Sequence, residues 1–129
     1  MNVYDEAHSL ARSLRGSVEF QTLLKAREAL DAEPEKLKRV QDLKIKEIEL
    51  QARVLAGEKV SQERMEALRQ MIDILLLDPT VRSYLEAEGR FTRLFTDIQK
   101  IIADAVKEWE PLVQPRTSEC DAKETDKHD

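Results

Sequence analysis

Histidine and cysteine are too few and too far apart in this sequence to form a metal site or a catalytic pair. The chain has two histidines, His8 and His128, and one cysteine, Cys120. No second His or Cys stands at the spacing that an HExxH motif or a Cys/His zinc site requires. Glu119 and Asp121 flank Cys120 and disfavour the thiolate, which is the nucleophilic form. We therefore expect no metal, no cofactor and no activated thiol.

Nucleotide and hydrolase chemistry also lack their usual motifs. The sequence contains no GxGxxG, no GxxxxGK[ST] and no GxSxG, and its three glycines are isolated from one another. A backbone cradle for phosphates therefore cannot form from consecutive residues. Carboxylates are abundant, but a glycosidase-like pair would have to face a common cleft, and nothing in the pattern indicates one. We predict that the protein is not an enzyme and has no small-molecule substrate.

One carboxylate has an unusual position. Glu88 stands between Tyr84 and Phe91 in the apolar stripe of the last predicted helix. In one interpretation it pairs with an arginine and fixes the register of the helices, as buried polar groups sometimes do. The candidate partners are Arg12, Arg15 and Arg90. In the other interpretation the stripe is open to solvent there and Glu88 points to water.

A single basic stretch is the only candidate for contact with nucleic acid. Its cations, diluted by Glu35 and Asp42, are Lys36, Lys38, Arg39, Lys44 and Lys46. No aromatic residue stands beside them to stack on bases, and lysine stems often cover apolar helix surface while their charged ends stay in water. The net charge of −5 gives no global positive field. We favour a solvated helix face and expect no nucleic-acid partner, with Lys38, Arg39, Lys44 and Lys46 as the residues to test.

The composition predicts the elements that carry these residues. With 129 residues, 3 Gly, 4 Pro and 5% aromatic residues, the chain is one domain and has too few turns for a sandwich or barrel. Ser17, Ser61 and Asp78 are N-cap candidates, and Pro34 suits a first helical turn. The predicted helices cover 3–15, 17–32, 34–56, a segment that begins at 61, and 79–110. We predict an all-α, antiparallel bundle of about five helices over 1–112, with a disordered polar tail over 113–129.

The long third and fifth predicted helices have more apolar surface than one core needs. On the third helix, two adjacent sectors are apolar, and on the fifth the apolar residues alternate in steps of four and three, as in a coiled-coil seam. A helix over 79–110 would be roughly 47 Å long. We expect it either to meet a second chain, in a dimer or larger homo-oligomer, or to break at Gly89 and fold back. The predicted interface residues are Leu43, Leu50, Val54, Phe91, Phe95, Ile98, Ile102 and Trp109.

The expected compartment is the cytoplasm. The first residues have neither a basic start nor an apolar stretch, which argues against a signal peptide. The longest apolar run covers only 74–77, far short of the roughly 18 residues that suggest a membrane span. One cysteine cannot form an intrachain disulfide. We expect no membrane association.

Several segments together resemble a known family. They are Val3-Tyr4-Asp5-Glu6-Ala7, Leu14-Arg15-Gly16-Ser17-Val18-Glu19-Phe20, Ala56-Gly57-Glu58, and Glu86-Ala87-Glu88 with Phe91 and Leu94. In order and spacing they resemble the YlbF/YmcA family of small bacterial proteins, closest to its YheA-like branch, over about residues 2–110. The resemblance implies an all-helical, cytoplasmic, self-associating protein. Better-studied relatives act without catalysis, as regulatory partners in competence, sporulation and biofilm control and in specifying RNA processing by an endonuclease.

The resemblance also marks a difference. Those relatives carry several C-terminal cysteines and have been linked to iron–sulfur clusters, and Cys120 alone cannot supply the usual four thiolates. Two functional hypotheses follow. The first is a non-catalytic, self-associating regulatory or adaptor protein with a protein partner. The second is an accessory factor for RNA processing that contacts RNA or an endonuclease.

Overall fold

The computed structural model describes residues 2–109, and within them the chain is all-α. It has five helices, with no strand in the described range: α1 (Val3–Arg15), α2 (Val18–Asp31), α3 (Pro34–Leu55), α4 (Gln62–Leu75) and α5 (Pro79–Ala105). The prediction of about five helices with a long third and fifth is confirmed. The predicted tail over 113–129, Cys120, and the end of the predicted domain at 112 lie outside the described residues.

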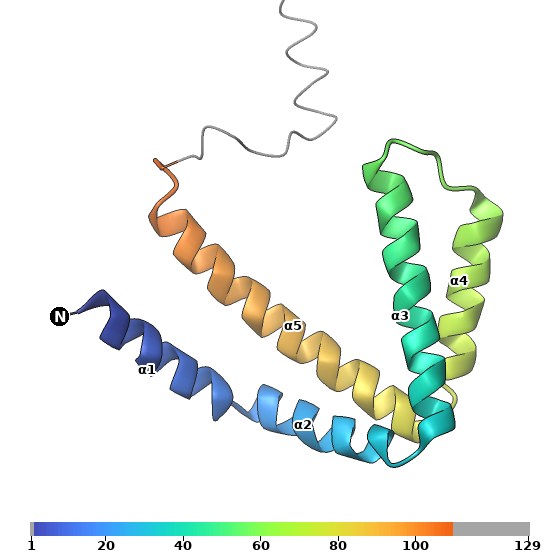
Figure 1. Ribbon diagram of the computed structural model, residues 1–129, viewed down its shortest axis with the longest axis horizontal. Coiled ribbons are helices and arrows are strands. Elements are labelled where there is room, and N and C mark those ends of the chain that lie inside the picture. The colour runs from blue at the N-terminus through green and yellow to red at the C-terminus, as the bar shows by residue number, and fades with distance from the viewer. Residues whose placement is uncertain (1, 110–129) are drawn as a thin grey trace, which may run out of the picture.

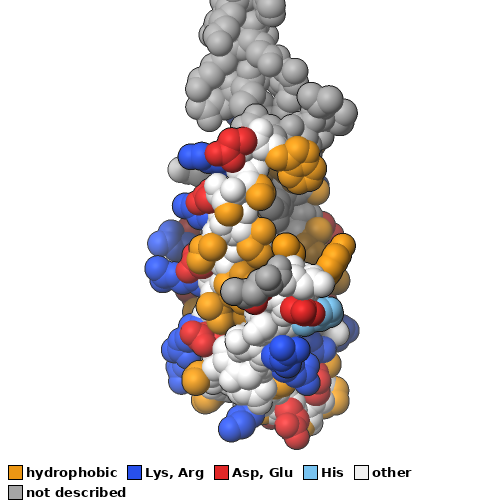
Figure 2. Space-filling model, turned by 90° about the vertical axis from the view of Figure 1, so that its left-hand side faces the viewer, with side chains coloured by type: hydrophobic (Ala, Val, Ile, Leu, Met, Phe, Trp, Pro, Cys, Tyr) orange, Lys and Arg blue, Asp and Glu red, His pale blue; other side chains and the backbone are white. Residues whose placement is uncertain are grey.

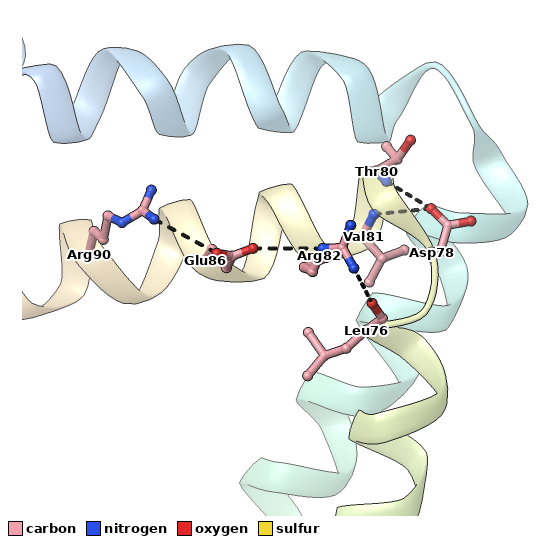
Figure 3. Close-up of polar contacts among 7 residues, drawn as sticks. All are labelled: Leu76, Asp78, Thr80, Val81, Arg82, Glu86 and Arg90. Atoms are coloured by element: carbon pink, nitrogen blue, oxygen red, sulfur yellow. Dashed lines mark hydrogen bonds and ion pairs between the residues drawn. The ribbon is translucent and has the colours of Figure 1, made fainter.

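The helices begin where the capping residues predict. Ser17 and Ser61 each accept a hydrogen bond at Oγ from the backbone N–H three residues later, at 3.2 Å. Asp78 Oδ1 accepts from the N–H of Thr80 at 2.9 Å and of Val81 at 3.2 Å (Figure 3). These contacts satisfy backbone donors that have no partner inside the helix.

The helices form two arms that meet at one end, and the helices within each arm run antiparallel (Figure 1). In the first arm, α1 and α2 follow one another almost in line, and α5 runs back beside α2. In the second arm, α3 and α4 form a hairpin. The arms join where α2 turns into α3 and where α4 turns into α5, and they diverge from there.

The hydrophobic core lies at this junction. Its buried side chains come from α2, α3, α4 and α5: Leu30, Val40, Leu43, Leu75, Val81 and Tyr84. Leu43 is only 2% exposed, so it has almost no surface left for a second chain. The prediction that Leu43 lies in an intermolecular interface is wrong, because its side chain packs inside one chain.

The fifth helix differs from the prediction at its C-terminal end. α5 is continuous through Gly89, so the helix does not fold back there. It ends at Ala105 rather than near 110, since Val106 has φ −122° and ψ 27°, outside helical geometry. Trp109 therefore lies beyond the helix, in a turn in which its N–H donates to the carbonyl oxygen of Val106 at 2.9 Å. The prediction that Trp109 continues the helical seam is wrong.

Candidate interaction surfaces

The apolar stripe of α5 is covered near the junction and uncovered farther out. Phe91 packs against Phe20 of α2, with ring centroids 5.0 Å apart, and stacks on Phe95 at 6.0 Å. Phe20 lies near the start of α2, so beyond this point α1 replaces α2. The stripe of α5 continues there through Ile98 to Ile102, which is 54% exposed. The outer part of α5 thus presents apolar side chains that the other described residues leave partly exposed.

Helix α1, which precedes α2, also has apolar side chains that are left exposed. Its apolar residues recur at three- and four-residue spacing, yet none of its side chains is buried, and Val3 is 80% exposed. Figure 2, which looks at this end of the molecule, shows hydrophobic side chains gathered along it. We group the exposed and half-buried apolar residues of these two helices and of the turn after α5 under the name α1–α5 face: Val3, Tyr4, Leu10, Phe95, Ile98, Ile102 and Val106.

The structure divides the predicted interface residues among several places. Phe95, Ile98 and Ile102 belong to the α1–α5 face, and Phe91 is partly covered by Phe20. Leu50 and Val54 lie in the other arm, on α3, half-buried and exposed respectively. Trp109 is 74% exposed, past the end of α5.

The helical wheel of α3 did not show which of its two apolar sectors the chain itself covers. The sector with Val40 and Leu43 packs into the junction. The other sector is left bare at Ile45 and Ile48, the latter 65% exposed. The sequence gives no local signal for this choice, since it depends on where α5 lies.

A groove runs between α3 and α4 in the second arm. Its volume is about 250 Å³. The apolar residues that line it are Leu50 of α3 with Ala67, Leu68 and Met71 of α4. The charged residues along it are Lys46, Glu49 and Arg53 of α3 with Arg64 of α4. We call this feature the α3–α4 groove.

Glu88 has a partner that the sequence analysis did not consider. Its Oε1 accepts a hydrogen bond from Nζ of Lys44 on α3, and its Oε2 accepts one from the Tyr84 hydroxyl at 2.8 Å. The interpretation in which Glu88 pairs with a cation holds, but with Lys44 in place of an arginine, and the interpretation in which Glu88 points to water is wrong. Burial and the hydrogen bond to Glu88 raise the pKa of Tyr84 to about 12.

The basic residues of α3 do not form one patch. Lys44 forms an ion pair with Glu88, and its Nζ also lies 3.6 Å from Oε1 of Glu47. Lys38 and Lys44 line a hollow beside Tyr84, Arg39 lines another beside Asp78, and Lys46 lines the α3–α4 groove. These cations are divided between two sides of α3: Arg39 and Lys46, seven residues apart, share the side that faces α4, and Lys38 and Lys44 lie on another.

A second set of ion pairs holds the arms together at the junction. Nζ of Lys36 lies 2.8 Å from Glu33 Oε1 and 3.0 Å from Asp78 Oδ2. The ion pair with Lys36 and the backbone donors of α5 hold the pKa of Asp78 below its ordinary value. Arg82 donates to the Leu76 carbonyl oxygen at 3.4 Å, which closes the turn before α5 (Figure 3).

Residues 2–109 hold no group of three or more His, Cys, Asp or Glu side chains arranged to bind a metal ion. In the same residues, none of the helices combines the length and the hydropathy that a membrane span requires. The described surface thus offers apolar faces and a charged groove, which are features of contact with other macromolecules.

Comparisons with known proteins agree with this fold. A family model described as "Control of competence regulator ComK, YlbF/YmcA" matches residues 3–107. A UPF0342 protein of Symbiobacterium thermophilum is 40% identical over 104 residues, 81% of this chain and 93% of the relative. A UPF0342 protein of Desulfitobacterium hafniense is 34% identical over 112 residues, which cover 87% of this chain and 90% of the relative. A solved structure, a protein of unknown function (DUF964) from Bacillus stearothermophilus, has the same fold with a TM-score of 0.71, at 15% identity over 82% of this chain and 93% of that one.

Proposed function

The chain belongs to the YlbF/YmcA family, and on that premise we propose that it is a non-catalytic, self-associating regulatory adaptor that acts in the cytoplasm through contacts with a protein partner. The family description as a control of a competence regulator supports a regulatory role. The single observation that carries self-association is the α1–α5 face, an apolar surface that residues 2–109 leave largely uncovered.

A second copy of the chain is the occupant that this face fits best. Two adjacent helices whose apolar stripes stay uncovered correspond to half of a four-helix bundle. A two-fold axis would place the same face of another copy against it, and such an interface is self-complementary because both sides contribute the same residues. Ile102 and Phe95 would then lose the water contacts that make an apolar patch an aggregation liability.

The test is a charge substitution in the α1–α5 face. Ile102→Glu would place an unpaired carboxylate in the apolar interface, and an oligomer can avoid that cost by dissociating. Because Ile102 contributes nothing to the junction core, we expect the variant to keep the helicity of the wild type. The measurements are mass by light scattering and helicity by circular dichroism at one protein concentration.

Ile48→Glu is the matched control, since Ile48 is a comparably exposed isoleucine in the other arm. We expect it to leave the mass of the oligomer unchanged. A wild-type protein that runs as a folded monomer of 14.9 kDa would contradict self-association. Dissociation by Ile48→Glu, with Ile102→Glu still associated, would move the interface to α3.

A further inference from the structure

We propose that the α3–α4 groove binds an acidic amphipathic helix of a partner protein. This inference rests on the proposed adaptor role and names the chemistry of the partner. The groove belongs to the arm that diverges from α1, α2 and α5 (Figure 1), so a partner seated there leaves the α1–α5 face free. Both contacts can therefore exist at once, as an adaptor requires.

The groove offers apolar side chains from both α3 and α4 for a partner helix to cover. Leu50, Leu68 and Met71 are half-buried in it, so they offer apolar contact that is not yet fully used. Met71 is flexible and polarizable, and methionine adapts well to the side chains of a bound helix.

The charges along the groove favour a partner with negatively charged side chains. Three cations and one carboxylate line it, in a chain whose net charge is −5. Arg53 already has a partner, since its Nη1 lies 3.8 Å from Oε2 of Glu58. Among the described residues, Lys46 and Arg64 have no carboxylate within 4.0 Å, so they can pair with acids of a partner. Complementary charge of this kind favours the right partner over wrong ones.

A helix is the form of partner that the geometry favours. α3 and α4 lie side by side as a hairpin, and a third helix laid along their groove would place apolar residues at three- and four-residue spacing over Leu50 and Leu68. Glutamates on its flanks would meet Lys46 and Arg64. Two copies of this chain packed groove to groove would instead bring the same cations together, which disfavours self-pairing at this site.

The experiment uses the full-length chain and two synthetic peptides. Both are fluorescein-labelled amphipathic helices with leucines at three- and four-residue spacing, and they differ only in having glutamate or lysine on the flanks. Fluorescence anisotropy should show binding of the acidic peptide, weaker binding at higher salt, and little or no binding of the basic one. Arg64→Glu or Lys46→Glu should weaken binding of the acidic peptide by about tenfold or more.

Lys38→Glu is the matched control, because Lys38 is a cation of α3 that lies outside the groove, and it should leave the affinity unchanged. Equal binding of the two peptides, binding of neither, or full binding by the Arg64→Glu variant would overturn the proposal. Loss of binding in Ile102→Glu alone would overturn it too, because the peptide would then occupy the α1–α5 face. Light scattering keeps the two ideas separate: Arg64→Glu should still self-associate.

Discussion

Lys44 on α3 and Glu88 on α5, 44 residues apart in the sequence, form an ion pair that links the two arms close to their junction. The hydroxyl of Tyr84 donates to the other oxygen of the same carboxylate. Each oxygen of Glu88 thus has a donor, which explains how a carboxylate is accommodated in the apolar stripe of α5.

Removing the charge of Glu88 should destabilise the chain modestly. Glu88→Gln keeps a hydrogen-bond acceptor for Tyr84 but loses the ion pair with Lys44, and we expect the free energy of unfolding to fall by about 1 kcal/mol. Glu88→Ala should cost more, because it leaves both donors without their acceptor. Urea unfolding of the two variants measures the difference, and equal stabilities of Gln, Ala and wild type would contradict the pairing.

The raised pKa of Tyr84 predicts a loss of stability at high pH. The folded-state pKa of about 12 exceeds the ordinary value of 10.0, so folding favours the neutral phenol. Its contribution is fully present below pH 10 and is lost as the pH rises through 12. The difference in unfolding free energy between wild type and Tyr84→Phe should therefore shrink between these values.

Asp78 predicts the opposite dependence at low pH. The ion pair with Lys36 and the backbone N–H groups of Val81 and Thr80 hold the pKa of Asp78 below its ordinary value of 3.8. Its contribution to stability is present above that value and is lost as the pH falls through the lowered pKa. Asp78→Asn, which keeps the cap but not the charge, should be less sensitive to acid than wild type in urea unfolding.

Burial at the junction predicts the effect of truncating Leu43. Leu43→Ala should lower the free energy of unfolding by about 2–5 kcal/mol, as is typical of a leucine removed from a core. Val54→Ala, on the exposed part of the same helix, should change it by less than about 0.5 kcal/mol. Thermal or urea unfolding distinguishes the two, and a mild Leu43→Ala variant would contradict its place in the core.

The basic residues of α3 predict no specific contact with RNA. A variant with Lys38, Arg39 and Lys46 all changed to Glu keeps the Lys44–Glu88 ion pair and should fold normally. We expect neither the wild type nor this variant to bind RNA with an affinity that falls steeply between about 50 and 200 mM salt. Salt-sensitive binding by the wild type that disappears in the variant would favour the role as an accessory factor for RNA processing.

Local signals predicted the helices well because caps and breaks act over a few residues. Ser17, Ser61 and Asp78 each bond a backbone N–H within their own helix, so the sequence nearby suffices to predict them. The assignment of apolar faces is a different problem. Whether Leu43 or Ile48 is covered depends on how the arms meet, and a helical wheel holds no information about that.

The Lys44–Glu88 ion pair and the α3–α4 groove are harder to predict, because both consist of contacts between residues far apart in the sequence. Lys44 and Glu88 had each been singled out from the sequence, for different reasons, and only the fold brings them together. The α3–α4 groove likewise needs Arg64 of one helix beside Lys46 of another. Spacing along one helix cannot predict such pairs, because it relates only residues on one face of the same helix.

The placement of the core at the junction makes protection against amide hydrogen exchange uneven along the chain. Amides near Leu30 and Val81 exchange only when the junction opens, because both side chains are fully buried there. The first turns of α1 and the last turns of α5 can open without exposing any buried side chain, so their amides exchange early in an isolated subunit. In the proposed oligomer, the second copy that covers these two outer segments would slow the exchange of their amides.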